Sequence, residues 1–191
     1  MPLPLLTDKT LKLLGTGLIY LHGRCKDGTP LMFLDVIKLQ DMLKDNMICE
    51  HSFGSLHNFF AGYINRNMLI PGQVEKWIII LNINHFSVKK LPVKMFKAAA
   101  KELSSNWMQN TKRTVVVNLT MMQNAMAKFL QKFLDPSVVA RQVFCRESNP
   151  SEFDDFIFRS QRPIEYGGTA PKVTRYWPPT MPPLTEDEKR E

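Results

Sequence analysis

Histidine and cysteine are the side chains in this sequence that could supply a nucleophile, a general base or a metal ligand. The sequence contains four histidines and three cysteines: His22, His51, His57, His85, Cys25, Cys49 and Cys145. They are scattered, with no CxxC pair, and no cysteine is followed by the arginine that a Cys-x5-Arg phosphatase loop requires. The pattern therefore predicts neither a metal centre nor a cysteine enzyme.

The motifs that carry nucleotide or ester chemistry are also absent from the sequence. There is no phosphate-cradling P-loop, no GxGxxG after a predicted strand and no GxSxG elbow. A lysine stripe at 90, 94, 97 and 101 has no aromatic residue on its face, which argues against nucleic-acid binding. We therefore expect a binding protein without a cofactor, not an enzyme. A hydrolase or transferase stays open as a hypothesis that requires a nucleophile beside a base in a cleft.

Length and composition indicate one globular domain with a basic surface. Of the 191 residues 44% are hydrophobic, and no apolar run approaches the roughly 20 residues that span a bilayer. Charged residues interrupt the opening segment 1–21, which is predicted to be neither signal peptide nor anchor. Separated cysteines favour free thiols and a cytoplasmic location. The net charge of +7 favours transient contact with an anionic membrane or another acidic partner, although a solvated surface explains it equally well.

Hydrophobic periodicity predicts the elements that must position any site. An Asp27-Gly28 turn separates apolar segments 18–21 and 31–36, which predicts a β-hairpin. Buried strands are predicted at 77–83, 114–118 and 142–145. Helices are predicted at 37–48, at 52–67 with Ser52 as its cap, at 91–107, at 122–133, and in a short segment ending at 158 that Asn149 or Ser151 caps. The alternation predicts an α/β fold with a mixed, largely parallel sheet and helices packed on it.

The predicted helix before Asp135-Pro136 has an adaptable apolar face. Met122, Met126, Phe129 and Phe133 recur on it at helical spacing. Methionine and aromatic side chains suit contact with an acyl chain. Ordinary core packing explains the same spacing, and periodicity alone favours that explanation.

Two motifs in the later part of the chain are more specific. Residues 132–141 read KFLDPSVVAR, and residues 162–169 read RPIEYGGT. Together they resemble the CRAL-TRIO lipid-binding domain, the fold of the Sec-fourteen-like phospholipid transfer proteins. In that family a "phe-leu-asp-pro" turn precedes a strand, and a "leu-pro-x-glu-tyr-gly-gly" segment later ends the domain. Segments 22–30, 80–87 and 107–118 resemble further family motifs in the same order, so the resemblance spans roughly residues 15–170. It does not include the family's amino-terminal helical extension.

The resemblance implies a sheet floor and helical walls that enclose an apolar lipid pocket, gated by the helix at 121–134. The implied pocket residues are Ile79, Leu81, Val115, Val117, Met122, Met126, Phe129 and Phe133. The implied headgroup residues are Gln109 and Arg141, where phosphatidylinositol-transferring members have a glutamate and a lysine. Trp77 and Ile79 replace the family's choline-binding hydroxyl residues, so phosphatidylcholine binding by the same contacts is not expected.

The function implied by the resemblance is that of a lipid carrier. We expect a monomer that binds a phospholipid, phosphatidylinositol being one candidate, or another hydrophobic ligand, and transfers or presents it at membranes. Residues 1–170 are expected to form the domain and 171–191 a proline-rich, then charged tail that is extended or disordered. The alternative is a protein-interaction module with a collapsed pocket, in which Tyr176 and Trp177 dock on a partner or back onto the domain.

Overall fold

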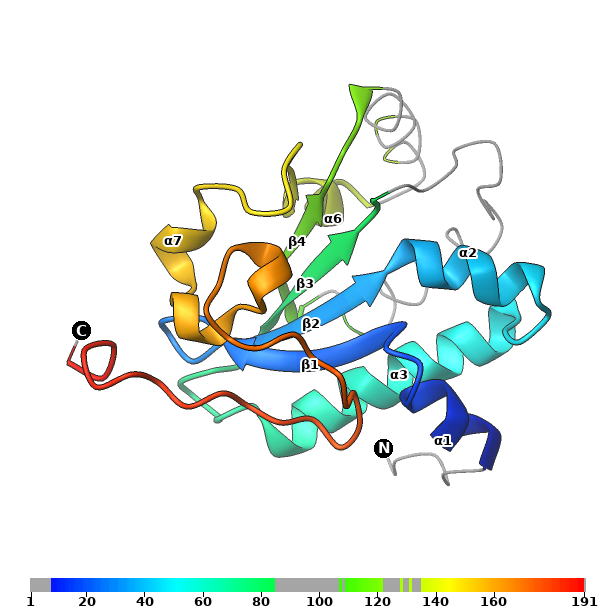
Figure 1. Ribbon diagram of the computed structural model, residues 1–191, viewed down its shortest axis with the longest axis horizontal. Helices are drawn as coiled ribbons and strands as arrows, with labels where there is room; N and C mark the ends of the chain where they lie inside the picture. Colours follow the sequence, from blue (N-terminus) through cyan, green and yellow to red (C-terminus); the bar gives the residue numbers. More distant parts are fainter. Residues whose placement is uncertain are drawn as a thin grey trace.

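A mixed β-sheet organises the part of the chain that the computed structural model describes, which is residues 8–84, 107, 109–121, 128, 131 and 135–190. The strands are β1 (Ile19–Arg24), β2 (Pro30–Asp35), β3 (Trp77–Asn82), β4 (Thr111–Val117) and β5 (Gln142–Phe144). They lie in the order β1-β2-β3-β4-β5 (Figure 1). β1 pairs antiparallel with β2, and the remaining neighbours pair parallel. The predicted α/β fold with a largely parallel sheet is therefore confirmed.

The β1–β2 hairpin follows from the residues of its turn. Gly28 has a φ of 80°, and Asp27 Oδ1 accepts a hydrogen bond of 3.1 Å from a backbone N–H two residues on. β1 also contains a bulge, at which Gly23 has a φ of 69°. A Cβ atom at Gly23 would lie 2.0 Å from the Gln161 carbonyl oxygen, so glycine is what allows a later segment to approach this edge strand.

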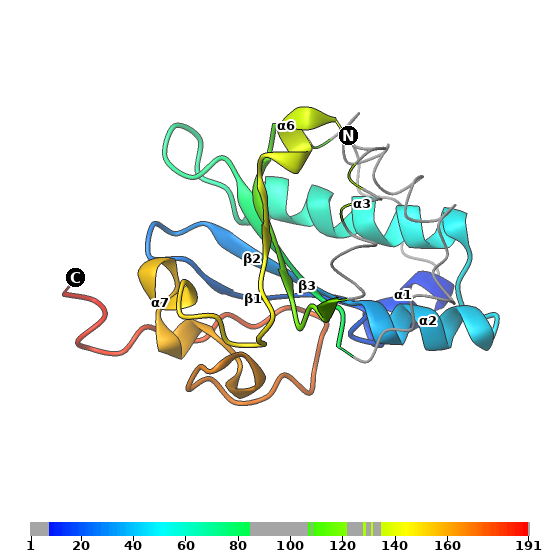
Figure 2. The ribbon, with the colours of Figure 1, turned by 90° about the horizontal axis from the view of Figure 1, so that it is seen from above.

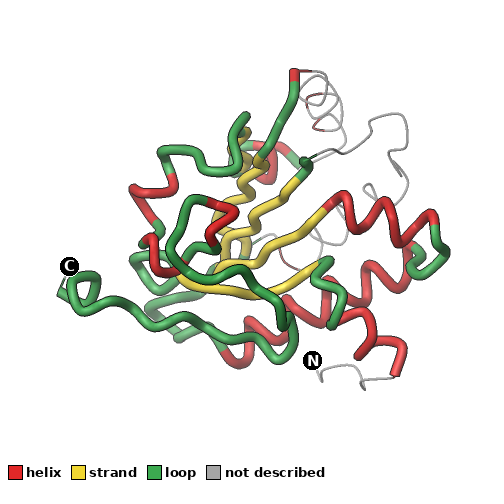
Figure 3. Tube along the Cα trace, in the orientation of Figure 1, coloured by secondary structure: helices red, strands yellow, loops and turns green. Residues whose placement is uncertain are grey.

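Helices and turns cover both faces of the sheet. The helices α1 (Asp8–Leu14), α2 (Val36–Lys44) and α3 (Glu50–Asn67) lie on one face. The helix α7 (Phe153–Phe156) and the 3-10 turns η3 (Arg159–Gln161) and η4 (Ile164–Tyr166) belong to the other side (Figure 2). A one-turn helix, α6 (Pro136–Val139), precedes β5 (Figure 3).

Strand alternation divides the core into two layers. Ile79 of β3 packs in the layer between the sheet and α1–α3, which we call the α3 layer. Ile78 and Ile80 point the other way, into the layer covered by α7, which we call the α7 layer. The almost continuous apolar run at 77–83 is therefore buried from both sides, as predicted.

The caps predicted for α3 and α7 differ from those in the structure. α3 begins two residues before Ser52, whose Oγ accepts a hydrogen bond from the Cys49 backbone N–H at 2.9 Å from within the first turn. Neither Asn149 nor Ser151 caps α7. Asn149 Oδ1 instead accepts a bond of 3.0 Å from Arg162 Nη1, because a buried guanidinium needs that acceptor.

The motif at 162–169 fastens the α7 layer. The Arg162 side chain is 1% exposed, forms an ion pair with Asp154 and lies over the Phe153 ring. Gly168 lies so close to the Arg162 backbone that a Cβ atom at this glycine would lie 1.9 Å from the Arg162 carbonyl oxygen. The motif thus has a packing role in this protein.

The segment after residue 170 is extended and packs onto the domain. The Tyr176 ring lies 5.2 Å from the Tyr20 ring, which belongs to the α7 layer. The next residue, Trp177, packs edge-on against Phe59 and Tyr63 of α3, at 5.1 and 5.0 Å between ring centroids. The tail therefore crosses the edge strand β1 between two consecutive residues. The tail is therefore extended, not disordered, and it docks on its own domain.

Two predicted helices lie largely outside the described residues. Of the helix predicted at 91–107, only Trp107 is described. Of the predicted gate helix at 121–134, the structure describes Met121, Lys128 and Gln131.

Candidate functional site

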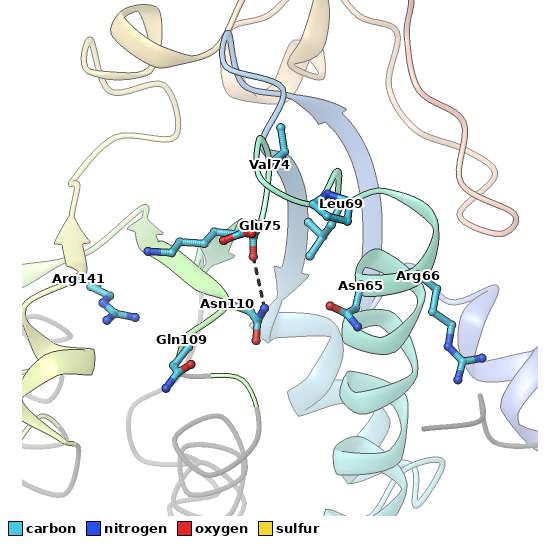
Figure 4. Close-up of a pocket in the computed structure, with 10 residues that line it drawn as sticks. Asn65, Arg66, Leu69, Val74, Glu75, Gln109, Asn110 and Arg141 are labelled. Atoms are coloured by element: carbon cyan, nitrogen blue, oxygen red, sulfur yellow. Dashed lines mark hydrogen bonds between the residues drawn. The ribbon is translucent and has the colours of Figure 1, made fainter.

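A cleft of about 740 Å³ opens at the edge of the sheet where the parallel strands begin (Figure 4). It is lined by Asn65, Arg66, Leu69, Pro71, Val74, Glu75, Lys76, Gln109, Asn110 and Arg141. Lys76, Asn110 and Arg141 immediately precede β3, β4 and β5. Because parallel strands start at the same edge of a sheet, these three residues lie close together at the cleft. Ligands of open α/β sheets usually bind at the opposite, carboxyl ends of the strands.

Arg141 is positioned by the turn before β5. Asp135 caps α6 by accepting a hydrogen bond of 2.8 Å from Ser137 N. α6 ends just before Arg141, whose carbonyl oxygen accepts a bond of 3.0 Å from Thr114 N of β4. Its Nη1 donates to the Thr111 carbonyl oxygen at 3.0 Å. The aspartate of the "phe-leu-asp-pro" turn therefore helps to determine where this guanidinium enters the cleft.

Gln109 is exposed on the turn before β4. The next residue, Asn110, donates its backbone N–H to Trp107 O at 3.1 Å and accepts from Trp77 N at 2.9 Å. Asn110 Nδ2 also donates to the Glu75 carbonyl oxygen at 3.3 Å (Figure 4). These bonds fix the turn and leave the Gln109 amide at the cleft.

The opposite wall comes from the end of α3 and the loop that follows it. Asn65 and Arg66 occupy the last turn of α3 and are exposed (Figure 4). Leu69 extends this wall and also packs against the α3 layer. Glu75 supplies the carboxylate of the lining, and its Oε1 accepts a bond of 3.1 Å from Gly72 N. The negative charge of the cleft is therefore engaged in holding the loop.

The electrostatic character of the cleft is cationic. Its charged side chains are Arg66, Lys76 and Arg141 against Glu75. Guanidinium groups donate paired hydrogen bonds to phosphate or carboxylate oxygens, and the neighbouring Gln109 amide can add another. No hydroxyl, thiol or imidazole side chain is among the ten lining residues. These ten described residues can hold an anionic group but include no such nucleophile to attack it.

The predicted pocket residues do not share one face of the sheet. Ile79 and Leu81 belong to the α3 layer, whereas Val115 and Val117 are buried in the α7 layer. The parallel register pairs Leu81 with Val116, which places Val115 and Val117 on the opposite face. The expectation that all four line one pocket is therefore wrong. The other predicted pocket residues, Met122, Met126, Phe129 and Phe133, lie outside the described residues.

The predicted headgroup residues, by contrast, meet in one cleft. Gln109 and Arg141 both line it, although they come from turns that precede different strands. Arg66 and Lys76 are not among the predicted site residues. The sequence signal for Lys76 is its place directly before a buried strand, the same place that Arg141 has.

Comparison with known proteins identifies the domain. A family model described as CRAL/TRIO domain matches residues 14–168. This chain belongs to the CRAL/TRIO domain family. Among solved structures, the crystal structure of Sfh5 is similar, with a TM-score of 0.63, 12% sequence identity, and coverage of 83% of this chain and 56% of Sfh5. At that identity the likeness shows the fold, and the chain spans little more than half the length of Sfh5. A search of curated proteins gives no match.

Membership in the CRAL/TRIO family gives the general function. Domains of this family bind and transfer lipids and other hydrophobic ligands, and they are generally not enzymes. Within the described residues, no helix of this CRAL/TRIO domain is both long and apolar enough to cross a membrane.

Proposed function

We propose that this CRAL/TRIO domain binds a phospholipid, with phosphatidylinositol as a candidate, and transfers or presents it at anionic membrane surfaces. The observation that carries the proposal is the meeting of Gln109 and Arg141 with Arg66 and Lys76 in one cleft. Three cations beside an amide suit a phosphodiester that carries a hydroxyl-rich headgroup.

The acyl chains of the proposed ligand extend from the cleft over the face that carries Ile79 and Leu81. Leu69 supports this direction, because it lines the cleft and also packs against the α3 layer. Burial of each methylene contributes about 0.8 kcal/mol, so the chains supply most of the affinity. Further proposed contacts from the predicted gate helix are Met122, Met126, Phe129 and Phe133.

We also propose that the protein acts as a cytoplasmic monomer that contacts membranes transiently. The net charge of +7 supports attraction to anionic lipid. The separated cysteines Cys25, Cys49 and Cys145, which form no disulfide within the described residues, support a reducing compartment.

The tail bears on the alternative of a protein-interaction module. Tyr176 and Trp177 are the tail residues best suited to a partner, and both pack on this chain's own domain. Their engagement favours the lipid-binding proposal over the interaction module.

The role of Arg141 can be tested with a soluble short-chain phosphatidylinositol. We expect Arg141→Ala to lower its affinity about tenfold to a hundredfold, because a hydrogen bond to a charged group contributes about 1.5–3 kcal/mol. Isothermal titration calorimetry measures the change. The matched control is Arg146→Ala, an exposed arginine just beyond β5 that does not line the cleft. Equal losses for a neutral sterol and for the phospholipid would contradict a phosphate contact.

The lipid itself can be identified by extracting the purified protein with organic solvent for mass spectrometry. A stoichiometric phospholipid is the expected result, and a phosphoinositide would support the headgroup assignment directly. An empty protein that also refuses fluorescent phospholipids would favour the interaction module instead.

A further inference from the structure

The loop between α3 and β3 has a rigid base and an exposed tip. Ile70 and Val74 form a β-bridge in which each backbone N–H donates to the other's carbonyl oxygen at 2.8 Å. Gly72 turns the tip with a φ of 75°, and the Glu75 carboxylate accepts its N–H. At the start of the loop, the Met68 carbonyl oxygen accepts a bond of 3.1 Å from an arginine of β1. The loop is therefore preorganised at both ends.

The apolar side chains of this loop point in two directions. Met68 and Val74 are buried, at 5% and 9% exposure, and anchor the base. Ile70 is 48% exposed, and Pro71 beside it is exposed as well. Ile70 does not line the cleft, although Leu69 and Pro71 do. The loop thus presents an isoleucine outward at the rim of the cationic cleft.

The charges around this tip have the sign that an anionic surface requires. Arg66 precedes the loop, Lys76 follows it, and both are exposed. Arg141 lies across the cleft, while the carboxylate of Glu75 is turned to the Gly72 N–H. An apolar tip between basic side chains is the combination by which peripheral proteins enter the headgroup region of a membrane.

We propose that residues 69–74 form a membrane wedge, in which Ile70 and Pro71 enter the headgroup region of an anionic bilayer while Arg66 and Lys76 contact its surface. The wedge adds a membrane-contact site to the proposed function. It rests on that function for the identity of the lipid that is transferred. It brings the mouth of the cleft against the bilayer, so a lipid can pass between them without crossing water.

Exposure of a single apolar side chain is common on protein surfaces, so exposure alone does not carry the proposal. Met47 makes this clear, because it is 52% exposed in the loop between α2 and α3, at the opposite end of α3 from Ile70 (Figure 1). Met47 follows Asp45-Asn46 instead of standing between basic residues. The basic setting and the rigid base are what distinguish Ile70.

The test uses the full chain and sedimentation with vesicles of phosphatidylcholine and phosphatidylserine. Ile70→Ser should weaken vesicle binding about fivefold, because the serine has no apolar area to bury in the membrane. Ile70→Trp should strengthen it, since tryptophan favours the interface. Met47→Ser is the matched control and should bind like the unaltered protein.

The cationic part of the wedge is tested with the double variant Arg66→Gln and Lys76→Gln. Each lysine or arginine near anionic lipid contributes about a fivefold factor, so vesicle binding by the double variant should weaken roughly twenty-fivefold. Lys44→Gln, at the far end of α2, is the matched control and should leave binding unchanged. Vesicles of pure phosphatidylcholine should bind the unaltered protein weakly.

The outcomes separate the wedge from the cleft. Ile70→Ser should keep its affinity for soluble short-chain phosphatidylinositol, whereas Arg141→Ala should lose it. Unchanged vesicle binding by Ile70→Ser would overturn the wedge and leave the proposed lipid binding intact. Failure of the unaltered protein to bind anionic vesicles, or binding to RNA in their place, would also overturn the wedge. A third outcome is that the unaltered protein binds anionic vesicles but no soluble phosphatidylinositol, and that Ile70→Ser loses the vesicle binding. This result would support the wedge and contradict the proposed phospholipid ligand.

Discussion

His57 shows how burial can determine the chemistry of a single residue. It lies on α3 with 5% exposure, and no described residue gives its Nε2 a hydrogen bond. Burial lowers the pKa of this imidazole from 6.5 to about 4. The side chain is therefore neutral at physiological pH and acts as part of the core, not as a base.

This pKa makes the stability of the fold depend on pH. The unfolded chain protonates His57 near pH 6.5, but the folded chain does so only near pH 4. The free energy of unfolding should therefore fall by about 3 kcal/mol as the pH decreases from 6.5 to 4, and be independent of this residue above that window. His57→Leu should remove that part of the slope in urea titrations. His22 is also buried with a lowered pKa, so some slope should remain.

The control for this prediction is His51→Gln, which changes an exposed histidine of the same helix. Urea titrations of this variant provide the baseline with which the slope of His57→Leu is compared. If the free energy of unfolding of His57→Leu changes between pH 6.5 and 4 as it does in the unaltered protein, His57 titrates similarly in the folded and unfolded states.

At the scale of elements, the tail protects an edge of the sheet. β1 is an edge strand, and exposed strand edges favour pairing with other chains. The tail passes over it, with Tyr176 on one face and Trp177 on the other. Further along, the Glu188 carboxylate accepts a hydrogen bond from Ser160 N at 3.2 Å. The tail therefore works as a strap across β1.

The strap makes a measurable contribution to stability. Trp177→Ala should lower the free energy of unfolding by about 2–3 kcal/mol, because the indole packs against three aromatic rings of α3. The corresponding fall in Tm is about 5–10 °C in a thermal scan. Thr174→Ala, an exposed position in the same tail, is the control and should change Tm little. A Tm that stays constant in Trp177→Ala would mean that the tail is not bound in solution.

At the scale of the whole molecule, the proposed lipid joins two parts of the fold. The cationic cleft receives side chains from α3, from the loop before β3 and from the turns before β4 and β5. The adjoining α3 layer receives them from β3 and from α1–α3. A ligand held by both parts would link elements that are distant in the sequence.

A ligand that binds only the folded state raises the stability of the whole domain. At a free concentration about 100 times its Kd it adds about 2.7 kcal/mol. Lipid-loaded protein should therefore unfold about 5–10 °C above delipidated protein in calorimetry. Reloading with phosphatidylinositol should restore the higher Tm, and Arg141→Ala should reduce the gain. An identical Tm for loaded and stripped protein would argue against a ligand within the fold.

The sequence by itself determined the five strands and their largely parallel sheet, but it did not predict the helices α1 and α6. The Asp27-Gly28 turn and the buried run at 77–83 depend on local conformational preference and periodicity, which neighbouring residues carry. The two later motifs predicted the family, and the structure gives their physical reasons. Asp135 caps α6 ahead of Arg141, and Gly168 leaves room for the backbone of Arg162.

Only the tertiary structure decided which predicted site residues meet. A strand sequence shows that side chains alternate, but the register with its neighbour decides which faces match, and that register separated Val115 and Val117 from Ile79 and Leu81. The cleft depends on a common edge of parallel strands, which brought Lys76 to Arg141 across a long sequence separation, and on the end of α3, which supplies Arg66. The docking of Trp177 likewise depends on aromatic rings of α3 far away in the sequence. Such contacts join segments that are far apart in the sequence, and local sequence patterns carry no information about them.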